Sequence, residues 1–381
     1  MTQENSDTVR INLERRVVDS YDIIIGTDLF PKIAKDLKEI SRASRFAIIT
    51  DSNVGPLYAR ALETRIRMTG LDCKTFSFEA GEKNKNMKTV TSLLNQLGKA
   101  RYNRDSLILA LGGGVVGDTA GLVAALINRG VPYIQIPTTT LAQADSAIGG
   151  KTGVDLPAGK NLVGAFKQPV RVYMDMKTLD TLDDRNYNSG LVEVIKYGVI
   201  ADGLFFEYLE QNMSKIRARD KEALVYIAKQ NSRIKGTVVE LDPLEGGLRK
   251  ILNYGHTPGH AIETLSGYKL LHGEAIAIGM NIAGTIAYLL GTGFTKEDLA
   301  RQNDLLMRMG LDIWVNPKIT KKDIIKKTLS DKKAAAGKAR YCLPSTIGEM
   351  MPYDRAYSIQ VESDIVGRAI DACRKGSRII F

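Results

Sequence analysis

The stretch Leu107-Ile-Leu-Ala-Leu-Gly-Gly-Gly-Val-Val-Gly-Asp118 decides the fold. A short apolar run leads directly into three glycines, and a helical pattern follows over Thr119–Asn128. In an open α/β sheet such a strand–turn–helix junction binds a dinucleotide, because glycines let the backbone approach a pyrophosphate and the helix N-terminus supplies amide donors. The spacing differs from the usual GxGxxG, so a tight turn that only packs helix on strand is the alternative.

Other apolar runs surround this junction. Phe46–Thr50, Tyr133–Ile136 and Val172–Asp175 are short, continuous and separated by helical patterns. Such strands are typical of a parallel sheet that is covered on both faces. The earlier segment Arg16–Ile25 fits either a hairpin or an added edge strand.

The pattern changes after about Leu182. Apolar residues recur at three- and four-residue spacing, and strand patterns return only at Tyr341–Leu343. A chain of 381 residues exceeds the usual size of one hydrophobic core. We therefore expect a Rossmann-like α/β nucleotide-binding domain over residues 1–182 and a mostly α-helical metal- and substrate-binding domain over residues 183–381. The expected helices are 187–212, 218–240, 259–268, 273–290 and 296–309.

Composition narrows the class of protein. The first sixteen residues, MTQENSDTVRINLERR, contain no apolar signal-peptide core, and we find no apolar run long enough to span a bilayer, so we expect a cytoplasmic protein without a membrane partner. The net charge of +10 favours anionic partners. The basic stretch Lys318–Arg340 lacks interleaved aromatic residues and reads as a solvated helix face, which argues against nucleic-acid binding. Cys73, Cys342 and Cys373 are expected to be reduced thiols.

Two polar segments are candidates for ribose contacts. Asp51 and Asn53 follow the end of a predicted strand, where an acidic side chain commonly binds a ribose hydroxyl. Glu82 and Lys85 lie in a polar loop, Gly81–Lys85. Acidic residues in such places are also frequent helix caps, which is the competing interpretation.

All three histidines of the chain, His256, His260 and His272, fall in one short window. Thr257 suits a helix N-cap and Pro258 a first helical position, which would place His256 just before a helix and His260 in its first turn. Clustered imidazoles predict a metal site, with a carboxylate as third ligand because no other histidine exists. A single histidine would more simply be a hydrogen-bonded core residue.

Cationic and amide side chains accompany the histidines. Such a set suits a small substrate with several negative charges, whereas ordinary surface lysines are the alternative. A glycine-rich loop over residues 146–161 carries part of it, and Glu193 precedes Lys196 by three residues, on one helix face. The members are Lys151, Lys160, Asn161, Lys196, Lys235 and Arg249, and the carboxylate Asp145 comes just before the loop.

The motifs together resemble the 3-dehydroquinate synthase family of sugar phosphate cyclases. They follow the order and spacing of that family over roughly residues 20–375. The motifs are LGGGVVGD, NRG, PTT, ADSAIGGKTGV, GKN, GAFKQP, EVIKYG, GLRKILNYGHTPGHAIE and LLHGEAIAIGM.

The resemblance implies an activity. Family members convert 3-deoxy-D-arabino-heptulosonate 7-phosphate into 3-dehydroquinate and phosphate, in the shikimate pathway to chorismate and the aromatic amino acids. The route implied is transient oxidation by NAD, phosphate elimination, re-reduction and intramolecular aldol closure. It also implies a divalent metal, zinc or cobalt, and a homodimer.

The resemblance further assigns residues to roles. It implies metal ligands Glu193, His256 and His272, and catalytic residues Asp145, Lys151, Lys196, Lys235 and His260. It implies substrate contacts from Asn161, Arg249, Asn253, a lysine of Lys332 and Lys333, and Arg129 of a partner subunit. It implies NAD contacts from Asp51, Asn53, Glu82, Lys85, Gly113, Gly114, Val115, Asp118, Thr138, Thr139, Lys151, Lys160, Thr181 and Leu182.

This chain departs from the family pattern in a few places. Asn186 stands where Glu is common, Asp155-Leu156 replaces Asn-His, and Ala147 replaces Ser. These departures bear on cofactor geometry. Arg249, Asn253 and His260 match the dehydroquinate type, but an amino-dehydroquinate synthase or another sugar phosphate cyclase stays open. A further alternative is an NAD- and metal-dependent polyol dehydrogenase, whose neutral substrate would not need the cations.

Overall fold

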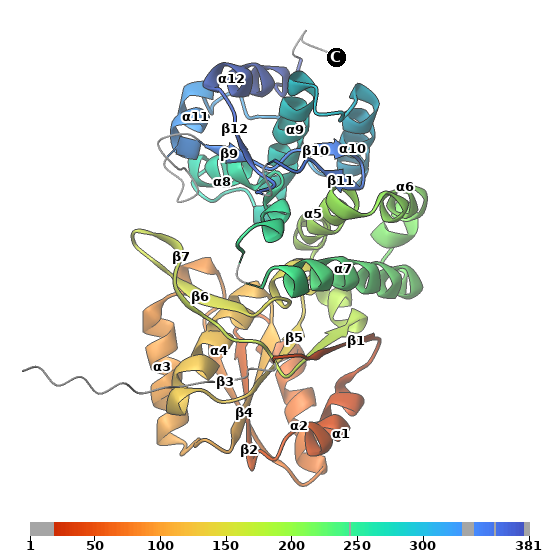
Figure 1. The fold of residues 1–381 in the computed structure, drawn as a ribbon. Coiled ribbons are helices and arrows are strands. Elements are labelled where there is room, and N and C mark those ends of the chain that lie inside the picture. Colours follow the sequence, from red (N-terminus) through yellow and green to blue (C-terminus); the bar gives the residue numbers. More distant parts are fainter. Residues whose placement is uncertain (1–18, 244, 330–338, 354–355, 377–381) are drawn as a thin grey trace, which may run out of the picture.

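A six-stranded parallel sheet forms the first half of the chain (Figure 1). The computed structural model describes residues 19–243, 245–329, 339–353 and 356–376. The strand order is β1-β8-β5-β4-β2-β3. The strands are β1 Asp22–Gly26, β2 Arg45–Asp51, β3 Asp72–Phe78, β4 Ser106–Gly112, β5 Tyr133–Pro137 and β8 Arg171–Asp175.

Helices cover both faces of this sheet, as the continuous apolar strands predict. Phe46 and Ile48 of β2 pack with α1 and α2, whereas Ala47 and Ile49 pack with α3 and α4, because successive side chains of a strand point to opposite faces. The helices are α1 Phe30–Ile40, α2 Arg60–Met68, α3 Met87–Lys99 and α4 Gly114–Leu126. The predicted Rossmann-like α/β class is confirmed.

The strand order reverses between β2 and β4. From β2 the chain moves to β3 on one side, then returns to β4 on the other side of β2. Asp51 ends β2 and Gly113 follows β4, so both lie at the carboxyl ends of the two strands that flank this switch point. Open α/β sheets bind ligands in the crevice at that place.

One expectation about the first half is wrong, and one strand was missed. The segment expected to be a glycine-rich loop forms an antiparallel hairpin, β6 Lys151–Leu156 and β7 Gly159–Phe166. The hairpin packs on α4, where a side chain at Gly121 would collide with Thr152. Its glycines hide the strand pattern because they serve close backbone approach. The edge strand β3 was not predicted.

The N-terminal alternative is also decided. β1 pairs in parallel with β8 at the sheet edge, so the added edge strand is confirmed for the described part of this segment. Residues 1–18, including Arg16, lie outside the described part of the chain.

The second half is mainly helical and lies beyond the carboxyl ends of the strands (Figure 1). Short strand pairs, β9 with β12 and β10 with β11, accompany the helices. The helices are α5 Asp184–Ala201, α6 Gly203–Arg217, α7 Lys221–Leu241, α8 His256–Leu265, α9 His272–Leu290, α10 Lys296–Arg308, α11 Lys321–Leu329 and α12 Ser363–Ala372. The strands are β9 Arg340–Tyr341, β10 Pro344–Thr346, β11 Glu349–Met350 and β12 Ile359–Gln360.

Two helix boundaries differ from expectation. The helix expected over 187–212 is two helices, because Asp202 is extended (φ −155°, ψ 96°) and its side chain caps α6 through the amide of Phe205. α8 begins at His256 rather than after it, because Gly255 takes the left-handed conformation (φ 74°) and serves as N-cap. Thr257 therefore does not cap the helix.

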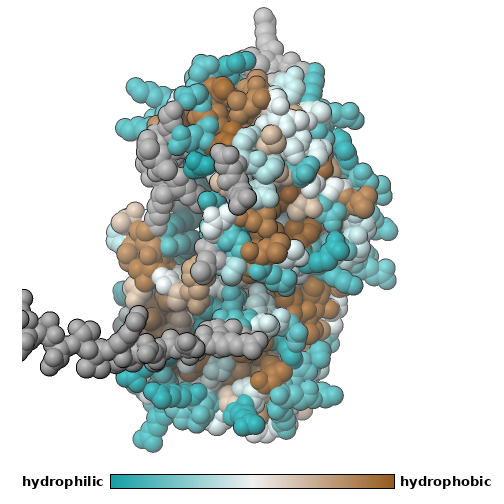
Figure 2. Space-filling view, viewed as in Figure 1, coloured by the Kyte–Doolittle hydropathy of each residue, from teal (hydrophilic) through white to brown (hydrophobic). Residues whose placement is uncertain are grey.

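Helix α9 is long and apolar enough to cross a membrane, contrary to our reading of the sequence. Most of it is buried inside the protein, so it is the kind of core helix that passes the same test. The face shown in Figure 2 carries separate apolar patches among hydrophilic residues rather than a continuous apolar belt.

Candidate active site

The glycine turn serves two purposes. A Cβ at Gly112 would lie 2.5 Å from Val116, and one at Gly117 would lie 2.8 Å from Gln135, so these glycines allow tight packing of helix on strand. Gly113 and Gly114 are less crowded, with Thr139 and Ser146 atoms 3.1 Å from an added Cβ. The alternative interpretation, a tight turn that packs the helix on the strand, therefore applies to Gly112 and Gly117. The dinucleotide contacts of Gly113, Gly114 and Val115 stay a prediction.

Asp51 organises the loop after β2. Its Oδ1 accepts the backbone amides of Asn53 (2.9 Å) and Val54 (2.8 Å), so it holds the turn after β2, but Asp51 is not a helix N-cap, because Val54 has that position before the helical turn Gly55–Ala59. Both bonds engage Oδ1, and a ribose contact of Asp51 stays a prediction. Asn53 is exposed beside it.

A buried ion pair connects the Gly81–Lys85 loop with α4. Lys85 Nζ lies 2.6 Å from Asp118 Oδ2 and donates to Asn161 Oδ1 at 2.7 Å. Burial lowers the pKa of Lys85, but the Asp118 carboxylate outweighs it and the pKa is raised. Asn161 takes a left-handed conformation (φ 52°), and its backbone N–H donates to Asp155 Oδ1 at 2.7 Å. Asp155, a departure from the family pattern, therefore holds a predicted substrate residue in place.

We expect Lys85→Met to destabilise the protein by roughly 3–5 kcal/mol, because it leaves the Asp118 carboxylate buried without its partner. Because the folded pKa of Lys85 is raised, its contribution is complete at neutral pH and is lost as pH rises above 10.5 through the folded value. Urea denaturation at neutral pH measures the change. Lys83→Met, on the same loop but exposed, is the control and should change stability by about 0.5 kcal/mol or less. Equal effects of the two variants would contradict the prediction.

The three histidines converge, as their clustering predicts. One nitrogen of each lies within 4.8 Å of the others. The Tyr254 carbonyl accepts from His256 Nδ1 at 3.0 Å, which turns Nε2 of that ring toward Glu193 Oε1, 3.7 Å away. Nε2 of His272 lies 3.6 Å from the same oxygen.

These atoms fit a divalent metal. Both carboxylate oxygens of Glu193 are buried, and Oε1 accepts no hydrogen bond within the described part of the chain. Two ligands on one tetrahedral zinc lie roughly 3.4 Å apart, close to the separations of the two imidazoles from Glu193 Oε1. Lys196 forms an ion pair with Oε2 of Glu193 and donates to the Leu252 carbonyl at 2.9 Å. Oε1 is thus the oxygen that faces the imidazoles.

The protonation of the two imidazoles differs. Burial, with the charge of Lys196, holds the pKa of His256 well below its usual value, so its Nε2 carries a free lone pair at neutral pH. Burial lowers the pKa of His272 too, but Glu193 and Glu263 raise it to about 9. A metal that binds here at neutral pH must displace a proton from His272.

Close helix packing brings Glu193 and His272 together. Gly273 lies so near the Ser189 carbonyl of α5 that a side chain would collide with it, and its amide donates to Ser189 Oγ at 3.1 Å. Arg185 at the start of α5 forms a two-pronged bond to Glu274, at 2.7 and 2.8 Å. The N-terminus of α9 is therefore clamped onto the helix that carries Glu193.

A second polar cluster surrounds Asp145, in a short helical turn, Ala142–Ser146. Lys235 of α7 lies 2.8 Å from Asp145 Oδ1, and the Tyr197 hydroxyl donates to the same atom at 2.9 Å. Burial opposes ionisation of Asp145, but Lys235 and Lys196 hold its pKa well below the usual range. Tyr197 was missed from the sequence, where nothing but its place beside Lys196 distinguishes it.

Arg249 lies in the turn Leu248–Asn253 and is 2% exposed. Its guanidinium donates to the carbonyls of Pro243 (2.8 Å) and Gly149 (3.2 Å). Gly149 has φ 98°, and a Cβ there would lie 2.6 Å from Arg249 Nη2. The segment that leads into β6 and the helical half therefore meet at this arginine. Nearby, Glu245 pairs with Lys151 and accepts from Asn253 Nδ2 at 3.3 Å, which the sequence did not predict.

The remaining predicted residues are less closely gathered. Thr181 lies 2.5 Å from the Tyr58 hydroxyl, and the Leu182 carbonyl accepts from Arg219. The backbone N–H of Thr138 donates to the Gly112 carbonyl, and Thr139 follows in the chain. Arg129 is exposed beyond the end of α4, in a left-handed conformation (φ 68°). Lys332 and Lys333 lie outside the described residues.

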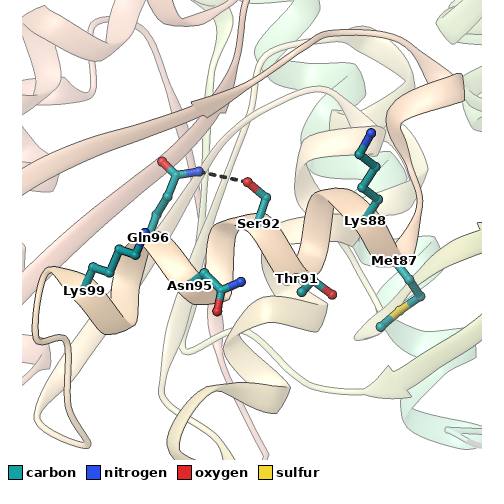
Figure 3. Close-up of a pocket in the computed structure, with 7 residues that line it drawn as sticks. All are labelled: Met87, Lys88, Thr91, Ser92, Asn95, Gln96 and Lys99. Atoms are coloured by element: carbon teal, nitrogen blue, oxygen red, sulfur yellow. Dashed lines mark hydrogen bonds between the residues drawn. The ribbon is translucent and has the colours of Figure 1, made fainter.

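A shallow hollow elsewhere carries none of the predicted site residues. It runs along one face of α3, where Gln96 donates to Ser92 at 3.3 Å (Figure 3). Its lining comes from this helix alone, which distinguishes it from the site, where strands, turns and the five helices α4, α5, α7, α8 and α9 contribute side chains.

The fold and the site together define a class of enzyme. A parallel sheet with a glycine turn at its switch point is followed by helices that hold a histidine–glutamate cluster beside buried lysines. Models of the 3-dehydroquinate synthase N-terminal and C-terminal regions match residues 75–189 and 190–334. The chain belongs to the 3-dehydroquinate synthase family.

Individual relatives agree. The chain is 43% identical over 340 residues to 3-dehydroquinate synthase of Prochlorococcus marinus (strain AS9601), covering 88% of this chain and 93% of that protein. It is 45% identical over 345 residues to 3-dehydroquinate synthase of Caldanaerobacter subterraneus subsp. tengcongensis, covering 90% and 96%.

Solved structures extend the comparison. A 2-deoxy-scyllo-inosose synthase complexed with carbaglucose-6-phosphate, NAD+ and Co2+ is 27% identical, with a TM-score of 0.84 over 91% of this chain and 95% of that one. The 2-epi-5-epi-valiolone synthase ValA from Streptomyces hygroscopicus, with NAD+ and Zn2+ bound, is 27% identical, with a TM-score of 0.84 over 95% and 98%. Glycerol dehydrogenase from Schizosaccharomyces pombe, at 16% identity and a TM-score of 0.66, shares the fold.

Proposed function

We propose that this chain converts 3-deoxy-D-arabino-heptulosonate 7-phosphate into 3-dehydroquinate and phosphate, with NAD and a divalent metal as cofactors. The observation that carries the proposal is the convergence of Glu193, His256 and His272 beside the buried ammonium of Lys196, in a chain of this family. When bound, NAD supplies reversible hydride transfer and the metal supplies Lewis-acid polarisation of a substrate oxygen.

Glu193, His256 and His272 would hold the metal. His256 is oriented by the Tyr254 carbonyl, and the buried Oε1 of Glu193 accepts no hydrogen bond within the described residues. Structural relatives bind Co2+ or Zn2+ with NAD+, which supports the same pair of cofactors here. His260 belongs to the same cluster, and we assign it to the substrate.

The cations of the site would bind and orient the anionic substrate. Arg249 has a buried Nε that makes no hydrogen bond within the described residues, which suits a planar carboxylate. Lys151 and Asn253 both contact Glu245, and Asn161 accepts a hydrogen bond from Lys85. When the substrate binds, these side chains would exchange these protein partners for substrate oxygens. Placement of charge before the reaction is the contribution the protein makes to catalysis.

The Asp145 cluster would fix protons near the substrate. The low pKa keeps the Asp145 carboxylate ionised, and the Lys235 ammonium is oriented by it. Burial raises the pKa of Tyr197 well above its usual value, so its hydroxyl stays protonated and donates a hydrogen bond to Asp145. Burial lowers the pKa of Lys235 against the opposing effect of Asp145, and Lys196 is held in place by Glu193 and the Leu252 carbonyl.

The test supplies purified protein with heptulosonate phosphate, catalytic NAD and Zn2+ or Co2+. We expect phosphate and 3-dehydroquinate to form together without net NADH. NADH accumulation with an unphosphorylated polyol would overturn the proposal in favour of a dehydrogenase. Turnover of the amino analogue but not of heptulosonate phosphate would indicate an amino-dehydroquinate synthase.

We further propose a homodimer in which Arg129 of the partner completes each site. Arg129 is exposed, and three consecutive left-handed residues, from Asn128 (φ 50°) to Gly130 (φ 113°), project it from the end of α4. Arg129→Ala and Lys235→Met should each be inactive, yet a refolded equimolar mixture should regain about a quarter of wild-type activity, since heterodimers contain one intact site. If a mixture shown to contain heterodimers stays as inactive as the two separate variants, the shared site is contradicted.

The organisation around this activity is also a proposal. We place the domain boundary at residues 182 and 183, with NAD held mainly by the first domain and the metal by the second. The many charged side chains and the buried position of α9 support a soluble enzyme, which we place in the cytoplasm.

A further inference from the structure

Glu263 contacts two predicted functional residues from different parts of the chain. It lies on α8, one turn after His260, and is 6% exposed. Its Oε1 accepts from Lys160 Nζ at 2.8 Å, and its Oε2 lies 3.5 Å from Nδ1 of His272. No role was assigned to Glu263 from the sequence.

Lys160 comes from the β6–β7 hairpin of the α/β half. Its ammonium also lies 3.4 Å from Glu82 Oε1 and 4.9 Å from the ring centre of Tyr268. Glu82 and Lys160 are predicted to contact NAD. The Glu263 carboxylate therefore joins a cofactor residue to a metal residue, with one oxygen for each.

The His272 contact has a chemical consequence. An imidazole that donates Nδ1–H to a carboxylate presents Nε2 as its lone-pair nitrogen, in a fixed ring orientation. Nε2 of His272 is the atom that faces Glu193 Oε1, 3.6 Å away. The Tyr254 carbonyl accepts from Nδ1 of His256 in the same way. Both imidazoles therefore direct Nε2 toward Glu193 Oε1.

We propose that Glu263 is a positioning residue, which orients His272 for the metal and couples that orientation to Lys160 on the cofactor side. This role rests on the proposed function, because it presumes a metal at Glu193, His256 and His272. Lys160 holds Oε1 and the histidine holds Oε2. Loss of either partner frees the carboxylate to turn toward the other.

The experiment measures metal affinity, without substrate or NAD, by competition of Zn2+ with a chromogenic chelator. Glu263→Gln keeps the shape, but its amide presents an oxygen to only one partner and N–H groups to the other. We expect a loss of affinity of about 10–100-fold. The absorption spectrum of the Co2+-loaded variant should change as the histidine reorients.

Lys160→Met tests the coupling with a residue that is about one third exposed and so tolerates replacement. We expect a smaller loss of metal affinity, and no further loss when it is combined with Glu263→Gln, because both act through one carboxylate. Glu210→Gln breaks a comparable two-pronged pair with Arg301, between α6 and α10, and should leave metal affinity unchanged.

The outcomes are distinct. Metal affinity of Glu263→Gln within twofold of wild type would overturn the role of Glu263 while the proposed function stands. A wild-type protein that binds no divalent metal would overturn the proposed function as well. If Glu263→Gln does not fold, the Lys160→Met affinity and Co2+ spectrum decide, and an unchanged pair of values would overturn the coupling.

Discussion

Replacement of Glu193 by glutamine is expected to lower kcat/KM by about 10³-fold or more, since Lewis-acid stabilisation contributes several kcal/mol. Glutamine offers a metal one neutral oxygen in place of a carboxylate. It also leaves the ammonium of Lys196, 1% exposed, without its counter-charge. We expect Zn2+ affinity to fall together with phosphate release, and both are measured on the same preparation.

Stability must be separated from catalysis in this variant. Loss of the buried pair with Lys196 costs roughly 3–5 kcal/mol, so unfolding of the metal-free protein is followed in urea. His272→Ala removes another predicted ligand and leaves the Lys196 pair intact, so it should lose metal and activity with less effect on stability. Glu207→Gln, exposed on α6, is the matched control. Full activity of Glu193→Gln in metal-free buffer would rule out a metal role for this carboxylate.

Replacement of Asp145 by asparagine is expected to reduce activity by about 10²-fold or more, because charge placement accounts for much of catalysis. Lys235 is 5% exposed and would lose its counter-ion, and Tyr197 would lose its charged acceptor. We expect a stability loss of roughly 1–3 kcal/mol, below that of a fully buried pair because a third of the Asp145 side chain is exposed.

The pH dependence tests the same carboxylate. The folded pKa of Asp145 is depressed, so its contribution to stability is present above the unfolded value of 3.8 and is lost as pH falls through the folded pKa. The difference between wild type and Asp145→Asn in urea should therefore be constant near neutral pH and shrink below pH 3.8. Asp184→Asn, an exposed partner of Arg219, should change neither activity nor stability appreciably. A difference that grows in acid would contradict this assignment.

Much of the fold could be predicted because its signals are local. The apolar runs at β2, β4, β5 and β8 are buried on both faces, which leaves continuous apolar sequence. β3, Asp72–Phe78, was missed because it is an edge strand with alternating polar residues. The β6–β7 hairpin was missed because its glycines serve close packing and resemble a loop.

By itself the sequence determined the class of the fold, the glycine turn, the clustered histidines and, through the family motifs, the reaction. These are written in residue type and short-range spacing. Only the tertiary structure decided which atoms meet: Glu193 with two imidazoles, Asp145 with Lys235, and Glu263 between Lys160 and His272. These contacts depend on how closely the helices pack, for example where Gly273 of α9 lies against the Ser189 carbonyl of α5. Helical periodicity specifies the buried face of a helix but not the partner or the depth at which that face packs.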